Sequence, residues 1–189
     1  MVRFLETVCA KEGVVASLPY HQKRVDATLQ AHGRYDSIDL QSILRPPKRG
    51  VWRCRILYDA SLRCTLSYHP YTVTIPTVIT PVFDDNIDYR YKYADRSAIE
   101  RLKNGFEEIL IVKNGFVTDT SVANIAFYDG TRWLTPDTPL LQGTMRAQLL
   151  EKRALHVSAI RFDRIRRYKK IALLNAMIGF LELDSGIIA

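Results

Sequence analysis

The sequence predicts an α+β protein built from two domains. Three observations carry this prediction: strand-like and helix-like segments within residues 1–80, an antiparallel meander between residues 109 and 135, and a helix that follows the meander. Pro76 and Pro81 bracket the segment TVIT, which is the best candidate for the link between the domains. We therefore expect a small α+β domain at residues 1–80 and a larger domain at residues 81–189.

The first domain opens with a hairpin and a helix. Residues 2–10 and 14–17 have the composition of strands, with Gly13 in the turn between them. Residues 18–32, LPYHQKRVDATLQAH, predict a helix with proline in its first turn and glycine just after its end. Residues 37–44 predict a second, short helix.

Two cations share a face of the first of these helices. His21 and Arg24 lie three residues apart, which places them on the same side. Taken alone, they are two surface cations on an amphipathic helix. After the helices, residues 51–59 and 64–75 alternate in polarity and predict two strands that complete the first domain.

Beyond the link, residues 87–96 have the sequence IDYRYKYADR. Successive residues of a strand face opposite sides, so the three tyrosines are expected on one side and Arg90 and Lys92 on the other. Lys92 then stands just before a predicted helix at residues 95–104, which Gly105 ends. Taken alone, Lys92 is an outward lysine on a half-exposed strand.

Residues 114–146 are the most informative stretch. Asn114-Gly115 joins two runs of β-forming residues, as a type I′ hairpin requires, and Asp129-Gly130 is a second short turn in the meander. The meander carries a lone carboxylate, Asp119, just before its second long strand. A hairpin aspartate is also common as a turn or capping residue. Gly143 and Thr144 lead into the helical run MRAQLLEKRAL, and a helix N-terminus entered in this way can bind an anion.

The end of the chain combines a basic cluster with an apolar run. Residues 161–170, RFDRIRRYKK, suit a solvated helix or loop, and the net charge of +7 favours anionic partners. A nucleic acid is the alternative partner, although Phe162 and Tyr168 are too few to form the aromatic platform of a single-strand binder. Residues 169–183, KKIALLNAMIGFLEL, predict a buried strand or helix.

The cysteines indicate reduced thiols in a cytoplasmic protein. Cys9, Cys54 and Cys64 are an odd number without the spacing of a zinc site, so we expect neither a disulfide framework nor a metal centre. No signal-peptide pattern is visible. Charges interrupt each apolar stretch well before the ~20 residues that a membrane span needs, so no membrane partner is expected.

Three motifs together resemble the signature of the class IV aminotransferases, the fold-type IV family of pyridoxal-phosphate enzymes. The family's N-G-x-[VI]-T-E-x-S-x-x-N, T-P and L-x-G-x-x-R segments are NGFVTDTSVAN, TP and LQGTMR here. The chain departs from the pattern at Asp119, where most members have glutamate. The family includes branched-chain aminotransferase, D-amino-acid aminotransferase and 4-amino-4-deoxychorismate lyase.

The resemblance implies a two-domain fold like that of D-amino-acid aminotransferase, with a small N-terminal α+β domain and a barrel-like C-terminal domain. It also implies pyridoxal 5'-phosphate as cofactor, an amino-bearing carboxylate as substrate and a homodimer. The segments KYADR and LLNAM are more similar to the lyase, so lyase-like chemistry is expected, with a D- or branched-chain amino-acid aminotransferase as the alternative. Because the chain is shorter than most members, a non-catalytic relic that still binds the cofactor is a further alternative.

Site residues follow from the same resemblance. Lys92 corresponds to the lysine that bonds to the cofactor and then moves protons at the substrate carbon, so it is the expected catalytic residue. Arg24, from the H-x-x-R pair of the first helix, corresponds to a ligand of the cofactor phosphate. Asp119 corresponds to the carboxylate that keeps the pyridine nitrogen protonated.

The remaining expected contacts surround the phosphate. Gly143, Thr144 and Met145 begin the helix whose backbone amides and dipole favour an anion. Asn175, within LLNAM, corresponds to a loop that lies near the phosphate in lyase-like members.

Overall fold

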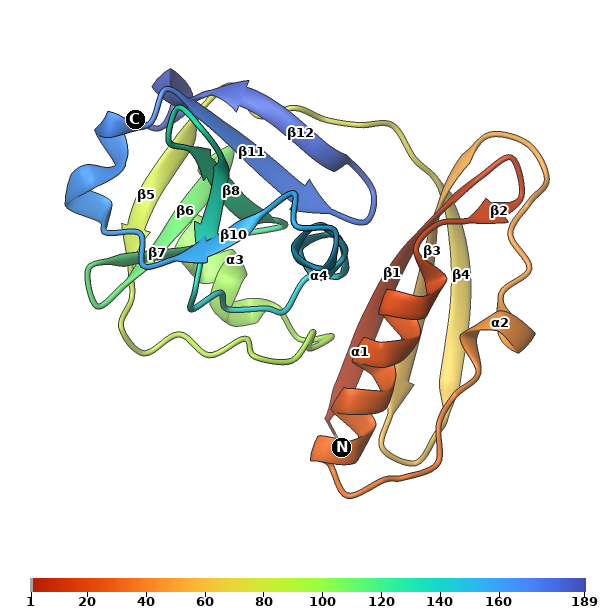
Figure 1. Ribbon diagram of the computed structural model, residues 1–189. Coiled ribbons are helices and arrows are strands. Elements are labelled where there is room, and N and C mark those ends of the chain that lie inside the picture. Colours follow the sequence, from red (N-terminus) through yellow and green to blue (C-terminus); the bar gives the residue numbers. More distant parts are fainter. Residues whose placement is uncertain (1) are drawn as a thin grey trace. The chain divides into compact units, whose positions relative to one another are not determined.

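The computed structural model describes residues 2–189, and the chain divides into two compact units (Figure 1). The first unit runs up to Val73 and also contains Tyr91–Asp95, while the second contains Thr74–Arg90 and Arg96–Ala189. The chain thus leaves the first unit before the expected division between residues 80 and 81, and later returns to it. The prediction that TVIT, residues 77–80, links the two domains is wrong. Ile79 and Thr80 belong to a strand that begins at Ile79.

An antiparallel sheet with a helix on one face forms the first unit (Figure 1). The strand order is β2-β1-β3-β4, and β1 pairs with β3 along its whole length. The elements are β1 (Arg3–Lys11), β2 (Val14–Val15), α1 (Leu18–Ala31), α2 (Leu40–Ile43), β3 (Val51–Asp59) and β4 (Cys64–Pro70).

Alternation along β1 determines which side of this sheet is buried. Phe4 and Val8 are fully buried and pack in one cluster with Val25 and Leu29 of α1. Burying a side chain of this size stabilises a fold by about 1.5–3 kcal/mol. The intervening residue Thr7 lies on the other side of the sheet and remains partly exposed.

Local turn chemistry explains the helix and hairpin of this unit, both of which confirm the prediction. Glu12 and Gly13 have positive φ angles of 50° and 78°, the left-handed conformation that a tight hairpin turn requires. α1 has a proline in its first turn and is followed by Gly33, also with positive φ. The predicted helix at residues 37–44 shrinks to α2, because Asp39 caps it by accepting a hydrogen bond from the Gln41 amide.

The second unit is, over the described residues, an eight-stranded sheet that curls around its own core (Figure 1). The strand order is β10-β9-β8-β7-β6-β5, and β11 pairs with both β8 and β12. Ile79 at one edge forms a bridge with Ile188 near the chain end, which helps to close the curl. Inside it lies an apolar cluster that includes Leu110, Ile125 and Phe127.

The bounds of its elements are β5 (Ile79–Phe83), α3 (Ser97–Lys103), β6 (Glu108–Lys113), β7 (Phe116–Thr120), β8 (Asn124–Tyr128), β9 (Trp133–Pro136), α4 (Thr144–Glu151), β10 (His156–Ser158), β11 (Lys170–Asn175) and β12 (Gly179–Asp184), with short 3-10 helices at η1 (Phe162–Arg167) and η2 (Ser185–Ile187). The predicted hairpin at Asn114-Gly115 joins β6 and β7, and both turn residues have positive φ. The apolar run at the chain end forms the hairpin β11–β12 rather than a helix.

The strand predicted from IDYRYKY is wrong. In this segment only Tyr93 joins a ladder, through an isolated bridge with Phe4 of β1. The chain passes from the second unit into the first between Arg90 and Tyr91, so the segment does not follow one sheet. The predicted alternation of side chains still holds for two of the tyrosines, because Tyr91 and Tyr93 both pack against Phe4.

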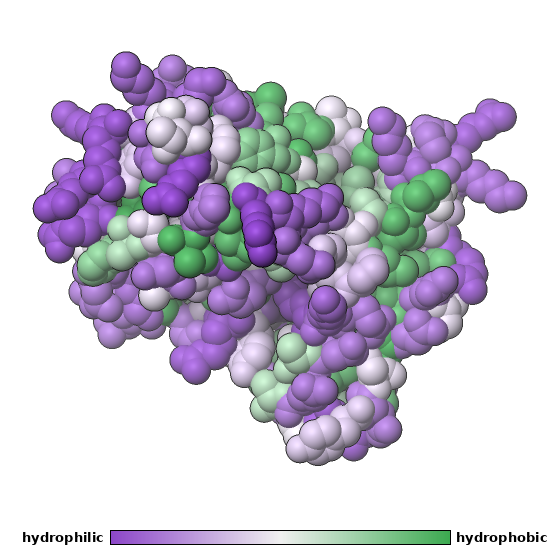
Figure 2. Space-filling view, in the orientation of Figure 1, coloured by the Kyte–Doolittle hydropathy of each residue, from purple (hydrophilic) through white to green (hydrophobic). Residues whose placement is uncertain are grey.

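Much of the face drawn in Figure 2 is hydrophilic, with smaller hydrophobic areas between the polar ones. The basic cluster at residues 161–170 includes the 3-10 helix η1, and Arg161, just before that helix, pairs with Asp163 at 2.9 Å. No helix among the described residues has both the length and the apolar character needed to cross a membrane. Within residues 2–189, no group of histidine, cysteine, aspartate and glutamate side chains is arranged to hold a metal ion.

Candidate functional site

Arg24 is held in place by a buried carboxylate from the neighbouring strand. Its Nε donates to Glu6 Oε1 at 2.7 Å and its Nη2 donates to Glu6 Oε2 at 2.8 Å, a two-pronged contact between α1 and β1. Glu6 is fully buried, whereas the Arg24 side chain keeps 13% of its surface exposed. The guanidinium therefore lies at the boundary of the core, with its orientation fixed from the protein side.

His21 completes this buried group. Its Nδ1 lies 2.7 Å from Glu6 Oε2, and both side chains are fully buried. Burial alone would raise the pKa of Glu6, but the charge of Arg24 and the hydrogen bonds from His21 and Arg24 lower it to about 2. Glu6 is therefore ionised at neutral pH. The alternative of two surface cations is wrong, because both His21 and Arg24 turn toward one buried acid.

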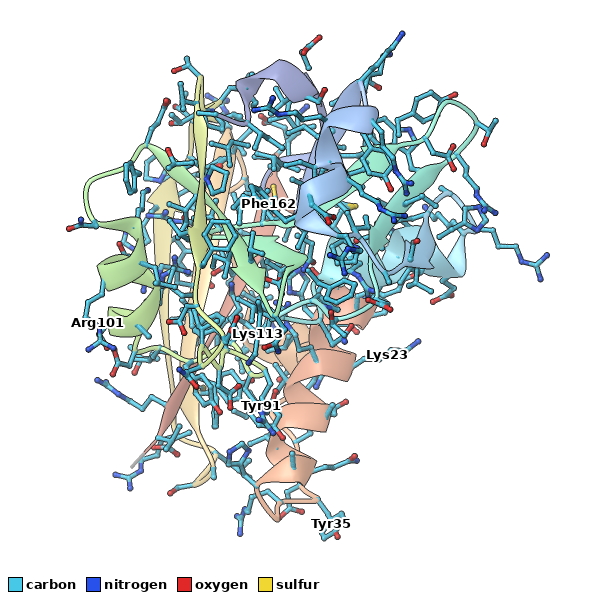
Figure 3. All side chains as sticks on the ribbon, turned by 90° about the vertical axis from the view of Figure 1, so that its left-hand side faces the viewer. Lys23, Tyr35, Tyr91, Arg101, Lys113 and Phe162 are labelled. Carbon is cyan, nitrogen blue, oxygen red and sulfur yellow. The ribbon has the colours of Figure 1, made fainter. Side chains whose placement is uncertain are left out.

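Lys92 is anchored through its backbone to the same strand. The Leu5 amide donates to the Lys92 carbonyl at 2.8 Å, and the Ala94 amide donates to the Arg3 carbonyl at 2.8 Å. Tyr91, which Figure 3 labels, lies beside it and packs edge-on against His32, which follows α1, with ring centroids 4.9 Å apart. Two consecutive residues of β1 therefore bind the two expected site residues. Leu5 holds the backbone of Lys92, and Glu6 holds the side chain of Arg24.

Asp119 is a buried carboxylate at the end of β7 in the second unit. Its Oδ1 accepts from Asn124 Nδ2 at 2.7 Å, and its Oδ2 accepts from the Leu141 amide at 2.9 Å. Burial raises its pKa to about 6, although these hydrogen bonds and the charge of Arg146 act in the opposite direction. Neutral donors therefore fix the position of this carboxylate. A cation placed against it would stabilise its ionised form.

Asn124 links Asp119 to the start of α4. The Asn124 Nδ2 also donates to the Leu141 carbonyl at 2.8 Å, which orients the amide on both sides. A Cβ atom on Gly143 would lie 1.8 Å from Asn124 Oδ1, so this position must be glycine for steric reasons although its φ of −71° suits any residue. Asp119, Asn124 and Gly143 therefore form one packed group.

The start of α4 leaves backbone donors available. Gly143 caps this helix without a side chain that could accept their hydrogen bonds, and Thr144 and Met145 are the first residues of the helix. Arg146, in the next position, is buried and donates to the Gln142 side chain at 3.0 Å and the Pro136 carbonyl at 2.9 Å. Burial lowers the Arg146 pKa, which the charges of Asp119 and Asp137 oppose. Arg146 thus braces the helix start and places a positive charge near Asp119.

Asn175 shapes the turn between β11 and β12. Its Oδ1 accepts from the amides of Met177 and Ile178 at 2.8 and 3.0 Å, while its Nδ2 donates to the Val122 carbonyl at 3.3 Å. Val122 belongs to the short connection between β7 and β8, two residues before Asn124. The second unit therefore brings the Asn175 turn next to the connection that follows Asp119.

Sequence reasoning missed Glu6, Asn124 and Arg146 as members of these groups. Asn124 and Arg146 lie inside the family motifs, but the contacts of Asn124 with Leu141 and of Arg146 with Pro136 depend on how the loop at residues 137–143 folds. Glu6 had one available signal: it shares the side of β1 that Phe4 and Val8 bury, where a charged residue needs a partner.

All the expected site residues except Arg24 lie in a stretch that matches a family model. The model of the family "Amino-transferase class IV" matches residues 90–185, about half of the chain. The chain belongs to the class IV aminotransferase family. The matched stretch of this class IV aminotransferase includes Lys92, Asp119, Gly143 and Asn175, whereas Arg24 precedes it.

Individual relatives agree with this membership. An uncharacterized protein of Haemophilus influenzae is 35% identical over 188 residues, which is 95% of this chain and 100% of that protein. The crystal structure of a putative 4-amino-4-deoxychorismate lyase from Haemophilus somnus is 34% identical with a TM-score of 0.87, over 95% of this chain and 98% of that one.

A more distant neighbour shows the fold alone. The PLP-bound form of a hypothetical aminotransferase from Mycobacterium tuberculosis has a TM-score of 0.76 at 15% identity, over 96% of this chain and 80% of that one. Together these likenesses confirm the α+β, fold-type IV architecture expected for this class IV aminotransferase.

Proposed function

We propose that the chain is a pyridoxal-phosphate-dependent enzyme whose reaction resembles that of 4-amino-4-deoxychorismate lyase. Family membership supports an enzyme, and the Haemophilus somnus structure at 34% identity carries the lyase name. The observation that carries the proposal within this chain is the buried carboxylate of Asp119, fixed by Asn124 and the Leu141 amide. A carboxylate in that setting suits a protonated ring nitrogen.

The charge of Asp119 suits the ring nitrogen of the cofactor. With the pKa of Asp119 raised to about 6 by burial, a cation against it would favour the ionised form. Asp119 would therefore favour a proton on the pyridine nitrogen, because pairing with a cation relieves the cost of a buried, unpaired charge. Pyridoxal phosphate, when bound, supplies an electron sink for the electrons of the substrate bond that breaks.

Each of the two units also offers donors that suit a phosphate dianion. The amides of Thr144 and Met145 begin α4 without a capping side chain, and a helix N-terminus favours negative charge. Arg24 contributes a guanidinium whose orientation Glu6 fixes. The Asn175 turn, which corresponds to the phosphate loop of lyase-like members, completes the proposed contacts.

Lys92 is the proposed catalytic residue. Its amine would bond to the cofactor and then accept and return a proton at the substrate carbon as general base and acid. Two backbone hydrogen bonds, from the Leu5 amide to the Lys92 carbonyl and from the Ala94 amide to the Arg3 carbonyl, fix the backbone that carries this side chain.

An aminotransferase acting on D- or branched-chain amino acids is the second candidate, because it needs the same lysine, carboxylate and phosphate donors. The distant structural neighbours named as aminotransferases share the fold. The KYADR and LLNAM segments favour the lyase-like reaction. We further propose that the protein is cytoplasmic and forms a homodimer. Sedimentation of the cofactor-loaded protein at micromolar concentration measures the oligomeric state.

Incubation with two sets of substrates tests the proposed reaction. The cofactor-loaded protein is given 4-amino-4-deoxychorismate, and separately D- and L-amino acids with 2-oxoglutarate. Release of 4-aminobenzoate and pyruvate supports the lyase-like reaction. Amino transfer to 2-oxoglutarate without 4-aminobenzoate would replace it by the aminotransferase, and no product in either assay would indicate a non-catalytic relic.

A further inference from the structure

The short turn between β7 and β8 carries Asp119 at its base. Thr120 and Ala123 flank the two turn residues 121–122, and the Thr120 amide donates to the Ala123 carbonyl at 2.9 Å. Asp119 is the next residue along β7, and it pairs with Asn124 across the ladder. A shift of this turn would therefore move the Asp119 carboxylate with it.

The two turn residues do not specify the geometry of the turn by themselves. Two-residue hairpin turns favour types I′ and II′, in which at least one turn residue has a positive φ angle. Asn114-Gly115 meets this requirement with both residues. Ser121 and Val122 both lie in the described part of the chain, and neither has a positive φ. The conformation of this turn therefore depends on contacts from other elements.

Three side chains from other elements hold the turn. Glu108 at the start of β6 accepts from the Ser121 amide at 2.8 Å, and Asn175 donates to the Val122 carbonyl at 3.3 Å. Arg96 at the start of α3 donates through its Nη2 to the Ser121 carbonyl at 2.8 Å. A hydrogen bond from a guanidinium is stronger than a longer one from a neutral amide. Arg96 thus provides the strongest hold on the carbonyl side of the turn.

Arg96 is itself fixed within the second unit. It caps the start of α3, where its carbonyl accepts from the Glu100 amide at 2.9 Å. Its Nε also lies 3.3 Å from Glu100 Oε1, but the Glu100 side chain is 58% exposed, and exposed ion pairs contribute little to stability. The Arg96 side chain is only 25% exposed. The contact of consequence is therefore the one with Ser121.

We propose that Arg96 is a positioning residue for Asp119 that acts through the Ser121 carbonyl. The inference rests on the proposed function, because it takes Asp119 as the partner of the pyridine nitrogen. While the turn is held, Asp119 and Asn124 keep the register in which the carboxylate accepts from the Asn124 side chain at 2.7 Å. Without this hold the carboxylate would sample other positions, and its pairing with the ring nitrogen would weaken.

The protonation state of the bound cofactor tests this assignment. Pyridoxal phosphate labelled with nitrogen-15 in its ring is loaded into the protein, and NMR spectra across a pH series give the midpoint at which the ring nitrogen loses its proton. We expect this midpoint to fall by roughly one pH unit in Arg96→Met, which corresponds to a tenfold weaker pairing with the carboxylate. Asp119→Asn, measured in parallel, shows the fall when the carboxylate is lost altogether.

Glu100→Gln is the matched control, because it removes the ion pair on α3 and leaves the contact between Arg96 and Ser121. A lower midpoint in Arg96→Met with an unchanged midpoint in Glu100→Gln supports the assignment. If Arg96→Met does not fold, Arg96→Gln replaces it under the same criteria, since glutamine stays polar but is too short to keep the contact with Ser121.

The parallel Asp119→Asn measurement separates failure of this inference from failure of the proposed function. A midpoint that falls in Asp119→Asn but not in Arg96→Met would overturn the role of Arg96 alone, as would equal falls in Arg96→Met and Glu100→Gln. A wild-type protein that takes up no pyridoxal phosphate, or an Asp119→Asn variant with the wild-type midpoint, would overturn the proposed role of Asp119 and this inference with it.

Discussion

At the scale of single residues, two buried carboxylates have opposite electrostatic settings. Burial alone would raise the pKa of Glu6, but the charge of Arg24 and the hydrogen bonds with His21 and Arg24 lower it to about 2. Asp119 has neutral donors as its direct partners, and burial raises its pKa to about 6. The first carboxylate is a structural anion that orients Arg24. The second is poised to receive a cation, which is the property that a cofactor site needs.

Glu6→Gln should destabilise the protein strongly. The substitution keeps the shape of the side chain but removes the charge between Arg24 and His21, and breaking a buried charge pair costs about 3 kcal/mol or more of unfolding free energy. Urea unfolding at pH 7 measures this loss. Glu151→Gln, at the exposed end of α4, is the control and should stay within about 0.5 kcal/mol of wild type. Equal stability of both variants would mean that the buried group does not anchor α1.

Asp119 should give the cofactor-free protein a distinctive dependence on pH. Its folded pKa of about 6 exceeds the ordinary value of 3.8, so the folded state binds the proton more tightly than the unfolded state. The contribution of Asp119 is therefore fully present below about pH 4 and is lost as pH rises to about 6, by about 3 kcal/mol.

Asp119→Asn isolates this effect, because the variant cannot titrate at that position. The unfolding free energy of wild type minus that of the variant should fall between pH 4 and pH 6 and then level off. Denaturant titrations of the two proteins at a series of pH values give this difference. A difference that is flat, or that rises with pH, would show that Asp119 is not held in a desolvated site.

At the scale of elements, turns were predictable and long-range pairings were not. Asn114-Gly115 specifies its hairpin locally, because both residues tolerate the positive φ of the turn. The segment around Lys92 resembled a strand by composition, yet its β-bridge is an isolated one, between Tyr93 and Phe4 of β1, more than eighty residues away in the chain. Glu6 was missed for the same reason, since its partners lie 15 and 18 residues further along.

Gly143→Ala tests the packed group at the start of α4. The added Cβ would meet Asn124 Oδ1 and displace the amide that donates to Asp119, so we expect a loss of roughly 1–3 kcal/mol of unfolding free energy and weaker cofactor binding. In an Asn124→Ala background the clash is absent, and the same substitution should then cost much less. A double-mutant cycle measures this coupling. If the substitution lowered the unfolding free energy equally in both backgrounds, Gly143 and Asn124 would not be energetically coupled.

At the scale of the whole molecule, the expected site residues are divided between two units. Arg24 and Lys92 belong to the first, and Asp119, Gly143, Thr144, Met145 and Asn175 belong to the second. The family motifs predict this set from sequence, because each motif is local in the chain. The supporting residues were not predictable, because their roles depend on which loops and strands meet within each unit.

Covalent labelling tests the central claim, that Lys92 binds pyridoxal phosphate, most directly. The protein is incubated with pyridoxal phosphate, reduced with borohydride, digested and mapped by mass spectrometry. We expect a phosphopyridoxyl group on Lys92, and its absence from the Lys92→Ala variant. Exposed lysines such as Lys23, which points away from α1, provide an internal control for non-specific labelling (Figure 3). Labelling spread over exposed lysines, or confined to a lysine other than Lys92, would contradict the account.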